Sequence, residues 1–309
     1  MNNILRAHLA LFLVNAFYGA NHIIAKGVMP NYLTPNVFIL LRVAGSAFLF
    51  WIIQLFFVKE RVAKKDLLLM AVCAIFGVAA NQLFFFNGLN LSSSINAGII
   101  MTVNPILVVI LSFFILKEKI TLRKSAGILI GATGAILLTL TAGTGSGDSL
   151  LGDLFLFINA TSYAIYLVLV KPLMQKYKPF TVITYVFSFG LLYVLFYPPT
   201  LMDLAETNFA QIPFDIVLKI LYVIIGVTFL AYLLTVYGLK FLSASVSSSY
   251  IYLQPVLVMI FTFLFGMWGI SEDYTDTITW EKAGYMLVIF IGVSLTSSAS
   301  FRKKKITTS

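Results

Sequence analysis

The sequence predicts an all-α membrane protein of ten transmembrane helices, arranged as two inverted five-helix repeats with both termini in the cytoplasm. Three observations lead to this fold class: an apolar composition, an internal repeat and an uneven distribution of charge. Of the 309 residues, 60% are hydrophobic and 11% are charged, whereas soluble domains carry about 25% charged residues. Because unpaired backbone groups are costly in lipid, we expect the continuous apolar runs to form helices.

Ten apolar runs, separated by charged or turn-forming segments, define the expected helices in order. They are 8–27, 36–58, 67–88, 95–116, 125–141, 150–171, 180–199, 214–237, 243–268 and 282–299. The breaks between them are marked by charged or turn-forming residues, such as Lys59–Asp66, Lys117–Lys124, the Gly/Ser/Thr run Thr141–Ser149 and Pro198-Pro199. We therefore expect the first repeat over 1–145, the second over 146–300 and a basic cytoplasmic tail over 301–309.

The repeat shows in the sequence itself. Positions 88–116 align without a gap on positions 238–266, and eight residues are identical, including Pro105 and Pro255. In so apolar a chain about two or three identities are expected by chance, so we infer a duplication. A duplicated apolar chain interrupted by prolines is typical of secondary transporters, whose site lies between the halves.

The distribution of charge predicts the orientation. Seventeen of the 21 basic residues lie in the ends and loops of one side, and nine of the 12 acidic residues lie on the other. Lysine and arginine remain on the cytoplasmic side, which places both termini there. Because five helices per repeat is an odd number, the second repeat must be inverted. The basic residues thus serve topology and contact with the bilayer, and we expect no nucleic-acid partner.

Polar residues on the expected helices 1 and 6 predict a cavity between the repeats. Asn15, Tyr18, His22 and Lys26 share one face of helix 1, because they are spaced by three or four residues. Such a face should look into the bundle, as a substrate site or as a hydrogen-bonding seam between helices. Helix 6 shows a similar face. Tyr163 and Lys171 are separated by eight residues, as are Tyr18 and Lys26, and Asn159, Ser162 and Tyr166 extend this face. We expect Lys171 to reach the headgroups.

Arg42 is the one formal charge deep within an expected span. An intramembrane arginine indicates a functional site, and no acidic residue lies deep in a span to neutralise it. With Lys26 it would favour a substrate that carries a carboxylate or a phosphate. Pro105 and Pro255 are expected near helix centres, as hinges or as packing kinks. Further polar residues that we expect at the site are Asn81, Gln82, Asn104, Tyr252 and Gln254.

The sequence shows no metal-binding cluster, phosphate-binding loop or nucleophile–base pair, so we expect no metal, no cofactor and no enzymatic activity. The single cysteine, Cys73, excludes an internal disulfide. If transport is coupled to protons, His22 is the expected carrier, since histidine titrates near neutral pH.

Taken together, 8–299 resembles the ten-helix EamA-type members of the drug/metabolite transporter superfamily. The similarity rests on weak motifs in both halves. In the first half these are Tyr18-Gly19 with Lys26, Arg42, Asn81-Gln82, Gly88-Leu89, Asn104-Pro105, Glu118-Lys119-Ile120-Thr121 and Ala126-Gly127. In the second half they are Tyr163-Ala164 with Lys171, Gly238-Leu239, Gln254-Pro255 and Ala283-Gly284.

The resemblance implies a central cavity lined by helices 1, 3, 4, 6, 8 and 9, with helices 5 and 10 at the periphery. It also implies export or exchange of small metabolites across the cell (inner) membrane. In place of the short turn that contains Glu118 in the first half, the second half has a longer acidic segment, 269–281. We expect an amino-acid-like substrate. The alternatives are an exchanger of phosphorylated or nucleotide-linked metabolites, a channel-like pore and a membrane enzyme.

Overall fold

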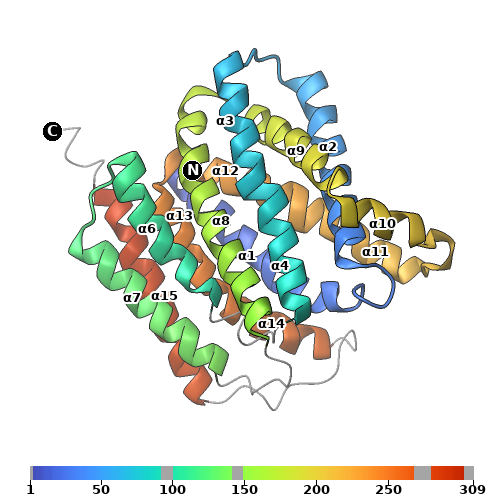
Figure 1. Ribbon diagram of the computed structural model, residues 1–309. Helices are drawn as coiled ribbons and strands as arrows, with labels where there is room; N and C mark the ends of the chain where they lie inside the picture. The colour runs from blue at the N-terminus through green and yellow to red at the C-terminus, as the bar shows by residue number, and fades with distance from the viewer. Residues whose placement is uncertain (1–2, 92–99, 141–148, 268–279, 303–309) are drawn as a thin grey trace.

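The computed structural model describes residues 3–91, 100–140, 149–267 and 280–302, and every element that these residues form is helical (Figure 1). The first half contains α1 (Asn3–Lys26), α2 (Pro35–Phe57), α3 (Lys64–Ala74), η1 (Ile75–Ala79), α4 (Ala80–Leu91), α6 (Val103–Leu116) and α7 (Leu122–Leu140). The second half contains α8 (Leu150–Lys176), α9 (Pro179–Leu195), α10 (Pro198–Glu206), η2 (Phe209–Gln211), α11 (Phe214–Tyr222), η3 (Val223–Leu230), α12 (Ala231–Phe241), α13 (Ala244–Ser249), η4 (Tyr250–Leu253), α14 (Gln254–Met267) and α15 (Trp280–Arg302).

The described helices include several that are long and apolar enough to cross a membrane. Five meet this test by length and composition, namely Pro35–Phe57, Lys64–Leu91, Leu150–Lys176, Phe214–Phe241 and Ala244–Met267. A sixth is obtained if α9 and α10, which are bent by 72° relative to each other, are taken as one span. Shorter apolar helices lie at Val103–Leu116 and Ala283–Ser297. The chain is therefore a multi-pass membrane protein, and a helix covers at least part of each of the ten expected spans.

Local sequence explains where several helices begin. Thr34 caps α2, because its hydroxyl accepts a hydrogen bond from the Val37 amide, and Pro35 occupies the first turn, where no amide hydrogen is needed. Ser149 caps α8 and Ser243 caps α13 in the same way. Local sequence also explains one helix end: α6 ends at Leu116, because Lys117 adopts a left-handed conformation with φ of 55°.

The two halves pack with interchangeable contacts. α1 of the first half packs on α12 of the second, and α8 of the second half packs on α4 of the first. Likewise α1 packs on α14 while α8 packs on α6, and α2 packs on η3 while α9 packs on η1. Exchanging the halves therefore reproduces these helix pairs. This pattern explains why a site at the centre receives residues from both halves.

Two glycines show the exchange at the level of residues. A Cβ on Gly88 would lie 3.0 Å from Leu156 Cγ, and a Cβ on Gly238 would lie 2.8 Å from Leu11 Cγ. The two glycines occupy equivalent positions of the duplicated segment, and each lets a backbone approach a leucine of the opposite half. The glycine repeat in the sequence therefore has a packing cause.

Two π-helical segments also occupy equivalent places. η1 interrupts the helix Lys64–Leu91, and η3 interrupts the helix Phe214–Phe241. When the repeat offset of 150 residues, which relates Gly88 to Gly238, is added to the residue numbers of η1, the result lies within η3. Short π-helical segments within α-helices are frequent at functional sites, because they redirect side chains and free backbone groups.

The prolines stand directly after breaks in helical spans. Pro255 lies near the middle of the span Ala244–Met267 and follows the 3-10 segment η4. Pro105 follows a break at Thr102 and is the third residue of α6. A proline removes one backbone donor and clashes with the preceding turn, so a break just before each proline agrees with the expected kinks.

α7 and α15 form a pair at the edge of the bundle, at the left of Figure 1. A Cβ on Gly292 would lie 2.4 Å from the backbone nitrogen of Gly131, so the two backbones are in close contact. Small residues at such crossings replace side-chain packing by backbone contact. The peripheral place of these two helices agrees with the expectation for helices 5 and 10.

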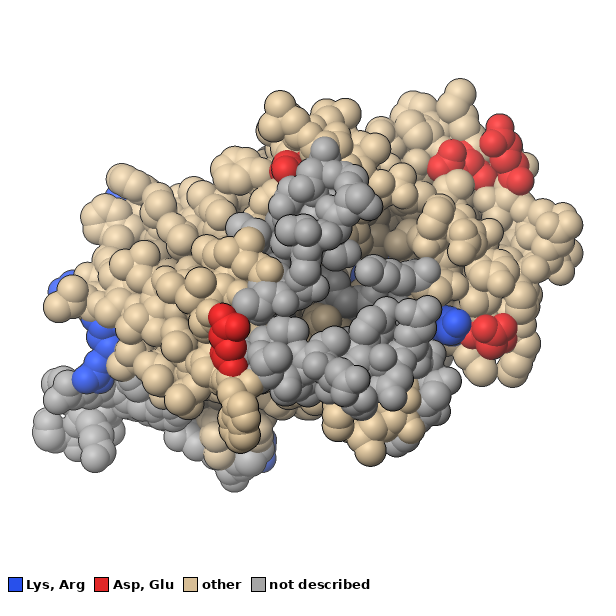
Figure 2. All heavy atoms as spheres, turned by 90° about the horizontal axis from the view of Figure 1, so that it is seen from below, with Lys and Arg blue, Asp and Glu red and all other residues tan. Residues whose placement is uncertain are grey.

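The two ends of the bundle differ in charge. Figure 2, which views the molecule from below, shows several acidic side chains on this face and few basic ones. The first turns of α8, α11 and α15 carry Asp153, Asp215 and Glu281. The opposite end holds the start of α3 with Lys64 and Lys65, and the end of α8 with Lys176.

Candidate functional site

Four tyrosines from three helices gather at the centre of the bundle. Tyr18 of α1 lies within electrostatic reach of Tyr163 and Tyr166 of α8 and of Tyr232 of α12. The rings of Tyr163 and Tyr166 stack with centroids 5.9 Å apart. Tyr166 is fully buried, whereas Tyr18 and Tyr163 retain some accessible surface. We call these four residues the tyrosine cluster; it contains three tyrosines that the sequence assigns to the site.

The η1 segment makes room for this cluster. A Cβ on Gly77 would lie 2.3 Å from the ring of Tyr166, so this position accepts only glycine as long as the ring stays in place. The hydroxyl of Tyr232 donates to the backbone oxygen of Gly77 at 3.0 Å. The segment therefore holds one tyrosine by contact and another by a hydrogen bond, which ties the first half to the second.

Arg42 enters the same region from α2. It is 4% exposed; its Nε donates to the hydroxyl of Thr228 at 3.1 Å, and Thr228 in turn donates to the backbone of Val223 in η3. The guanidinium carbon lies 4.8 Å from the ring centre of Phe86 and 5.5 Å from that of Phe38. Such stacking over aromatic rings stabilises a cation but does not neutralise it.

The charge of Arg42 lacks an acidic partner among the described residues. None of their ion pairs includes it, and its Nη1, which is buried, makes no hydrogen bond with any of them. A guanidinium carries five donors that match a carboxylate or a phosphate. The geometry thus leaves donor capacity at the centre of the bundle for an anionic group.

Gln82 lies close to this arginine. It stands four residues before Phe86 in α4, so the amide and the ring share one helix face. The side chain is 3% exposed and lies within hydrogen-bonding reach of the Tyr232 hydroxyl, while its Oε1 has no hydrogen-bond partner in the described part of the chain. A buried amide oxygen without a partner is costly unless a ligand or water satisfies it.

Two asparagines link η1 and α4 to the second half. The Nδ2 of Asn159 donates to the backbone oxygen of Asn81 at 2.6 Å, and Asn81 Oδ1 accepts from Tyr232 at 3.3 Å. These two predicted site residues therefore lie beside the tyrosine cluster. Because their described bonds run between helices, they position α4 against α8 and α12.

The other predicted residues whose side chains are described lie at contacts between helices, near the helix breaks at Thr102 and η4. Gln254 donates to the Oδ1 of Asn15 at 3.1 Å, as expected for a hydrogen-bonding seam between α1 and α14. Asn104 donates to the backbone of Ala160 at 2.7 Å and keeps an unpartnered, buried Oδ1. Tyr252 donates to the backbone of Thr102, the residue at the helix break.

Two predicted residues cannot be placed beside the others. His22 and Lys26 belong to α1, but their side chains lie outside the described part of the structure, as does that of Pro255. The sequence in turn left out Thr228 and Phe86, which contact Arg42. Tyr232, the fourth member of the tyrosine cluster, is likewise not among the predicted site residues. The 150-residue repeat, which aligns Tyr232 with Gln82, was the signal that could have selected it.

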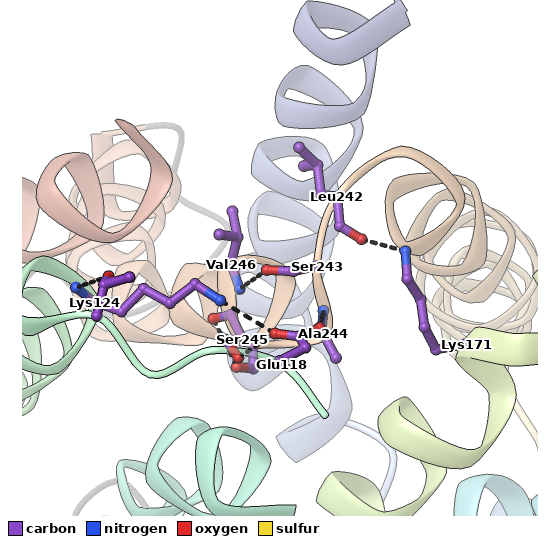
Figure 3. A network of polar contacts seen from close by, with 10 residues as sticks. Glu118, Lys124, Lys171, Leu242, Ser243, Ala244, Ser245 and Val246 are labelled. Carbon is purple, nitrogen blue, oxygen red and sulfur yellow. Dashed lines mark hydrogen bonds and ion pairs between the residues drawn. The ribbon is translucent and has the colours of Figure 1, made fainter. Parts of the chain in front are cut away.

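Lys171 differs from expectation. Instead of reaching the headgroups, its Nζ donates to the backbone oxygens of Leu239 and Leu242, where α12 ends (Figure 3). Free carbonyls at a helix C-terminus attract a cation, and two of them lie within hydrogen-bonding reach of Lys171. Lys171 therefore holds the turn between α12 and α13.

Glu118 holds the same turn from the other half. Its carboxylate accepts from the Ala244 amide at 3.2 Å and from the Ser245 hydroxyl at 2.9 Å, and it pairs with Lys124 at 3.1 Å (Figure 3). We call this set of four residues the Glu118 clamp. It joins the turn after α6 to the start of α13, so it connects the two halves at the basic end of the bundle.

Comparisons with known proteins agree with this architecture. The model of the EamA-like transporter family matches residues 5–140 and 150–298, one match for each half. A solved crystal structure shares the fold with a TM-score of 0.73 at 17% sequence identity, over 96% of this chain and 98% of the other.

Two relatives carry names that fit this family. The uncharacterized transporter YyaM of Bacillus subtilis (strain 168) is 28% identical over 310 residues, which cover 98% of this chain and 97% of the relative. The WAT1-related protein At4g30420 of Arabidopsis thaliana is 27% identical over 201 residues, 55% of this chain and 54% of that protein. Because the family model matches both halves almost throughout, the chain belongs to the EamA-like transporter family, within the drug/metabolite transporter superfamily.

Proposed function

We propose that the protein is a secondary transporter of small metabolites that carry a carboxylate, in particular amino-acid-like zwitterions. The observation that carries this proposal is Arg42, which is buried at the centre of the bundle and has no acidic partner among the described residues. A substrate carboxylate would supply the missing counter-charge and accept hydrogen bonds from the guanidinium.

The surroundings of Arg42 favour a zwitterion with an apolar or aromatic side chain. Gln82 Oε1 and Asn104 Oδ1 are buried acceptors without described partners, so either can accept from a substrate ammonium group. The rings of Phe38 and Phe86 lie against the guanidinium, and the tyrosine cluster adds stacking surfaces and hydroxyl groups. Carboxylate, ammonium and apolar groups would thus each meet a matching group.

We further propose ten membrane crossings, two inverted repeats and cytoplasmic termini in a cell (inner) membrane. The interchangeable helix contacts and the two ends of opposite charge support this arrangement. In alternating access the repeats would rock about the tyrosine cluster. The Glu118 clamp would close the cytoplasmic end, and substrate would be exported or exchanged without chemical change.

A ligand-stabilisation screen tests the substrate class. Purified protein would be heated with amino acids, with amines that lack the carboxylate, with acids that lack the ammonium group, and with sugar phosphates and nucleotides. A bound ligand at 100 times its dissociation constant stabilises the fold by about 2.7 kcal/mol. We expect amino acids to stabilise the protein most, and the amines to have no effect.

Variants relate the screen to the site. Arg42→Met should weaken amino-acid binding about 10-fold to 100-fold, because a hydrogen bond to a charged group is worth about 1.5–3 kcal/mol. Lys64→Gln removes an exposed positive charge at the start of α3 and should leave binding unchanged. Stabilisation by sugar phosphates alone, or equal stabilisation of both variants, would contradict the proposed substrate class.

A further inference from the structure

An open cavity lies at the end of α2, and none of its lining residues belongs to the tyrosine cluster. Its volume is about 430 Å³, and its lining includes Trp51, Gln54, Lys59, Glu60, Arg61 and Tyr185. This size falls within the range of roughly 300–1,000 Å³ that is usual for sites of small ligands. α2 is one of the helices long and apolar enough to cross a membrane, so the cavity lies where such a helix leaves the bilayer.

The charged residues of this cavity leave a positive surplus. Glu60 accepts a hydrogen bond from the backbone amide of Lys178 at 3.0 Å. Lys59 and Arg61 belong to none of the ion pairs among the described residues. The cavity is therefore lined by two cations and by one carboxylate that already accepts a hydrogen bond. This surplus of positive charge suits an anion of low charge, such as a phosphodiester.

The apolar part of the cavity faces the bilayer. Trp51 and Tyr185 form its aromatic wall, with ring centroids 5.8 Å apart, and Trp51 Nε1 donates to Ser188 at 2.8 Å. Tryptophan and tyrosine are typical of the headgroup level. Leu55, which also lines the cavity, is 67% exposed, and the adjacent Phe56 is 76% exposed. A ligand in this cavity would thus have lipid-facing surface beside its charged contacts.

We propose that this cavity binds the headgroup of an anionic phospholipid, with the phosphodiester at Lys59 and Arg61 and the acyl chains along Leu55 and Phe56. Gln54, which is 6% exposed and whose Oε1 has no partner among the described residues, adds an acceptor for a headgroup hydroxyl. A phosphatidylglycerol headgroup matches this combination, since it carries one negative charge and free hydroxyl groups.

Lipid retention tests the proposal without any transport assay. The purified full-length protein would be titrated with phosphatidylglycerol and with phosphatidylcholine, and bound lipids counted by native mass spectrometry. Each basic side chain near an anionic headgroup contributes roughly a fivefold change in binding. The double variant Lys59→Gln/Arg61→Gln should therefore bind phosphatidylglycerol about 25-fold more weakly.

The adjacent pair Lys64 and Lys65 provides the matched control, because both are exposed and neither lines the cavity. Lys64→Gln/Lys65→Gln should retain the affinity of the wild type. Equal losses in both double variants, or equal binding of the two lipids, would overturn the proposal. So would displacement of the lipid by the same concentration of free glycerol phosphate, which would indicate a site for a soluble anion.

A photoactivatable phosphatidylglycerol keeps the test independent of the variants' stability. On the wild-type protein, cross-links are expected in the peptide that contains residues 51–61, and ones confined to other parts of the chain would contradict the site. A protein that binds this lipid but transports no carboxylate would refute the proposed function alone, so the two failures are distinguishable.

Discussion

At the scale of single residues, the site depends on groups that are buried without complete partners. Arg42 has one described hydrogen bond and two aromatic neighbours, and the Oε1 of Gln82 has no described partner. Buried polar groups of this kind lower stability, so their presence at the centre of the bundle is best explained by what they bind. A role in binding and a role in folding predict opposite effects of substitution.

The first prediction uses this contrast. Burying a charge away from water costs several kcal/mol, and an apolar side chain of similar length avoids this cost. Arg42→Met should therefore unfold at the same temperature as the wild type or higher in the absence of ligand, as measured by thermal unfolding in detergent. A marked fall in the unfolding temperature would instead show that Arg42 holds the fold together.

A second prediction concerns Gly77. Gly77→Ala would force a methyl group into the ring of Tyr166 and should cost about 1–3 kcal/mol of stability, as overpacked cores do. Gly226→Ala in the equivalent segment η3 is the control, since its nearest contact, Phe17, lies 3.3 Å away. Equal effects of the two substitutions on the unfolding temperature would show that the Tyr166 contact is not what sets the cost.

The site residues were predictable to different degrees. Tyr18, Tyr163 and Tyr166 could be selected by helical spacing, because residues three or four apart share a face. Thr228 and Phe86 could not, since they contact Arg42 only through the packing of η3 and α4 on α2. The contacts of Lys171 could not be predicted, because no sequence pattern shows that the free carbonyls at the end of α12 lie within its reach.

At the scale of elements, helix pairs and one turn set the positions of the halves. α7 and α15 meet backbone to backbone, and the turn between α12 and α13 is held by Lys171 and by the Glu118 clamp. The ranges of the helices were predicted closely, because apolar runs end where charges begin. The breaks at Thr102 and η4 were also predictable, because a proline inside a helical span disturbs the turn that precedes it.

The third prediction tests the α7–α15 contact. Gly292→Ala places a methyl group 2.4 Å from a backbone nitrogen, which cannot move as a side chain can, so the pair must separate. We expect a loss of roughly 1–3 kcal/mol in stability. Gly284→Ala in the same helix meets nothing within 4 Å and should change the unfolding temperature little. Wild-type stability in Gly292→Ala would show that the helices do not approach this closely.

The fourth prediction tests the Glu118 clamp. Glu118→Gln removes the ion pair with Lys124 and weakens two charge-assisted hydrogen bonds, each worth about 1.5–3 kcal/mol. The basic end of the bundle, which the clamp holds closed in the proposed mechanism, should then open more often. In a Cys73→Ala background, Val246→Cys offers a buried reporter, because Val246 is 1% exposed. Its labelling by a polar thiol reagent should become at least about 10-fold faster.

Glu281→Gln, at the acidic end of the bundle, serves as the control and should leave the labelling of this reporter unchanged. If Glu118→Gln also leaves it unchanged, the contacts of Glu118 merely cap a helix and do not govern opening.

At the scale of the whole molecule, a duplicated scaffold surrounds a site of unequal chemistry. The fold class followed from composition, repeat and charge, all of which are properties of the entire chain. The site is asymmetric: α2 supplies Arg42, and η3 supplies the hydroxyl that orients it. Sequence symmetry alone cannot reveal such a specialised site, because duplication predicts where a cavity lies and leaves open which half supplies its charge.

The central claim is that Arg42 binds the carboxylate of a carried substrate, and counterflow in proteoliposomes tests it most directly. Vesicles loaded with an unlabelled amino acid that stabilises the protein would receive the labelled compound outside. We predict saturable uptake that the internal substrate accelerates, a loss of about 10-fold or more in Arg42→Met, and no acceleration by the corresponding amine. Uptake that does not saturate, or equal counterflow in Arg42→Met, would contradict the account.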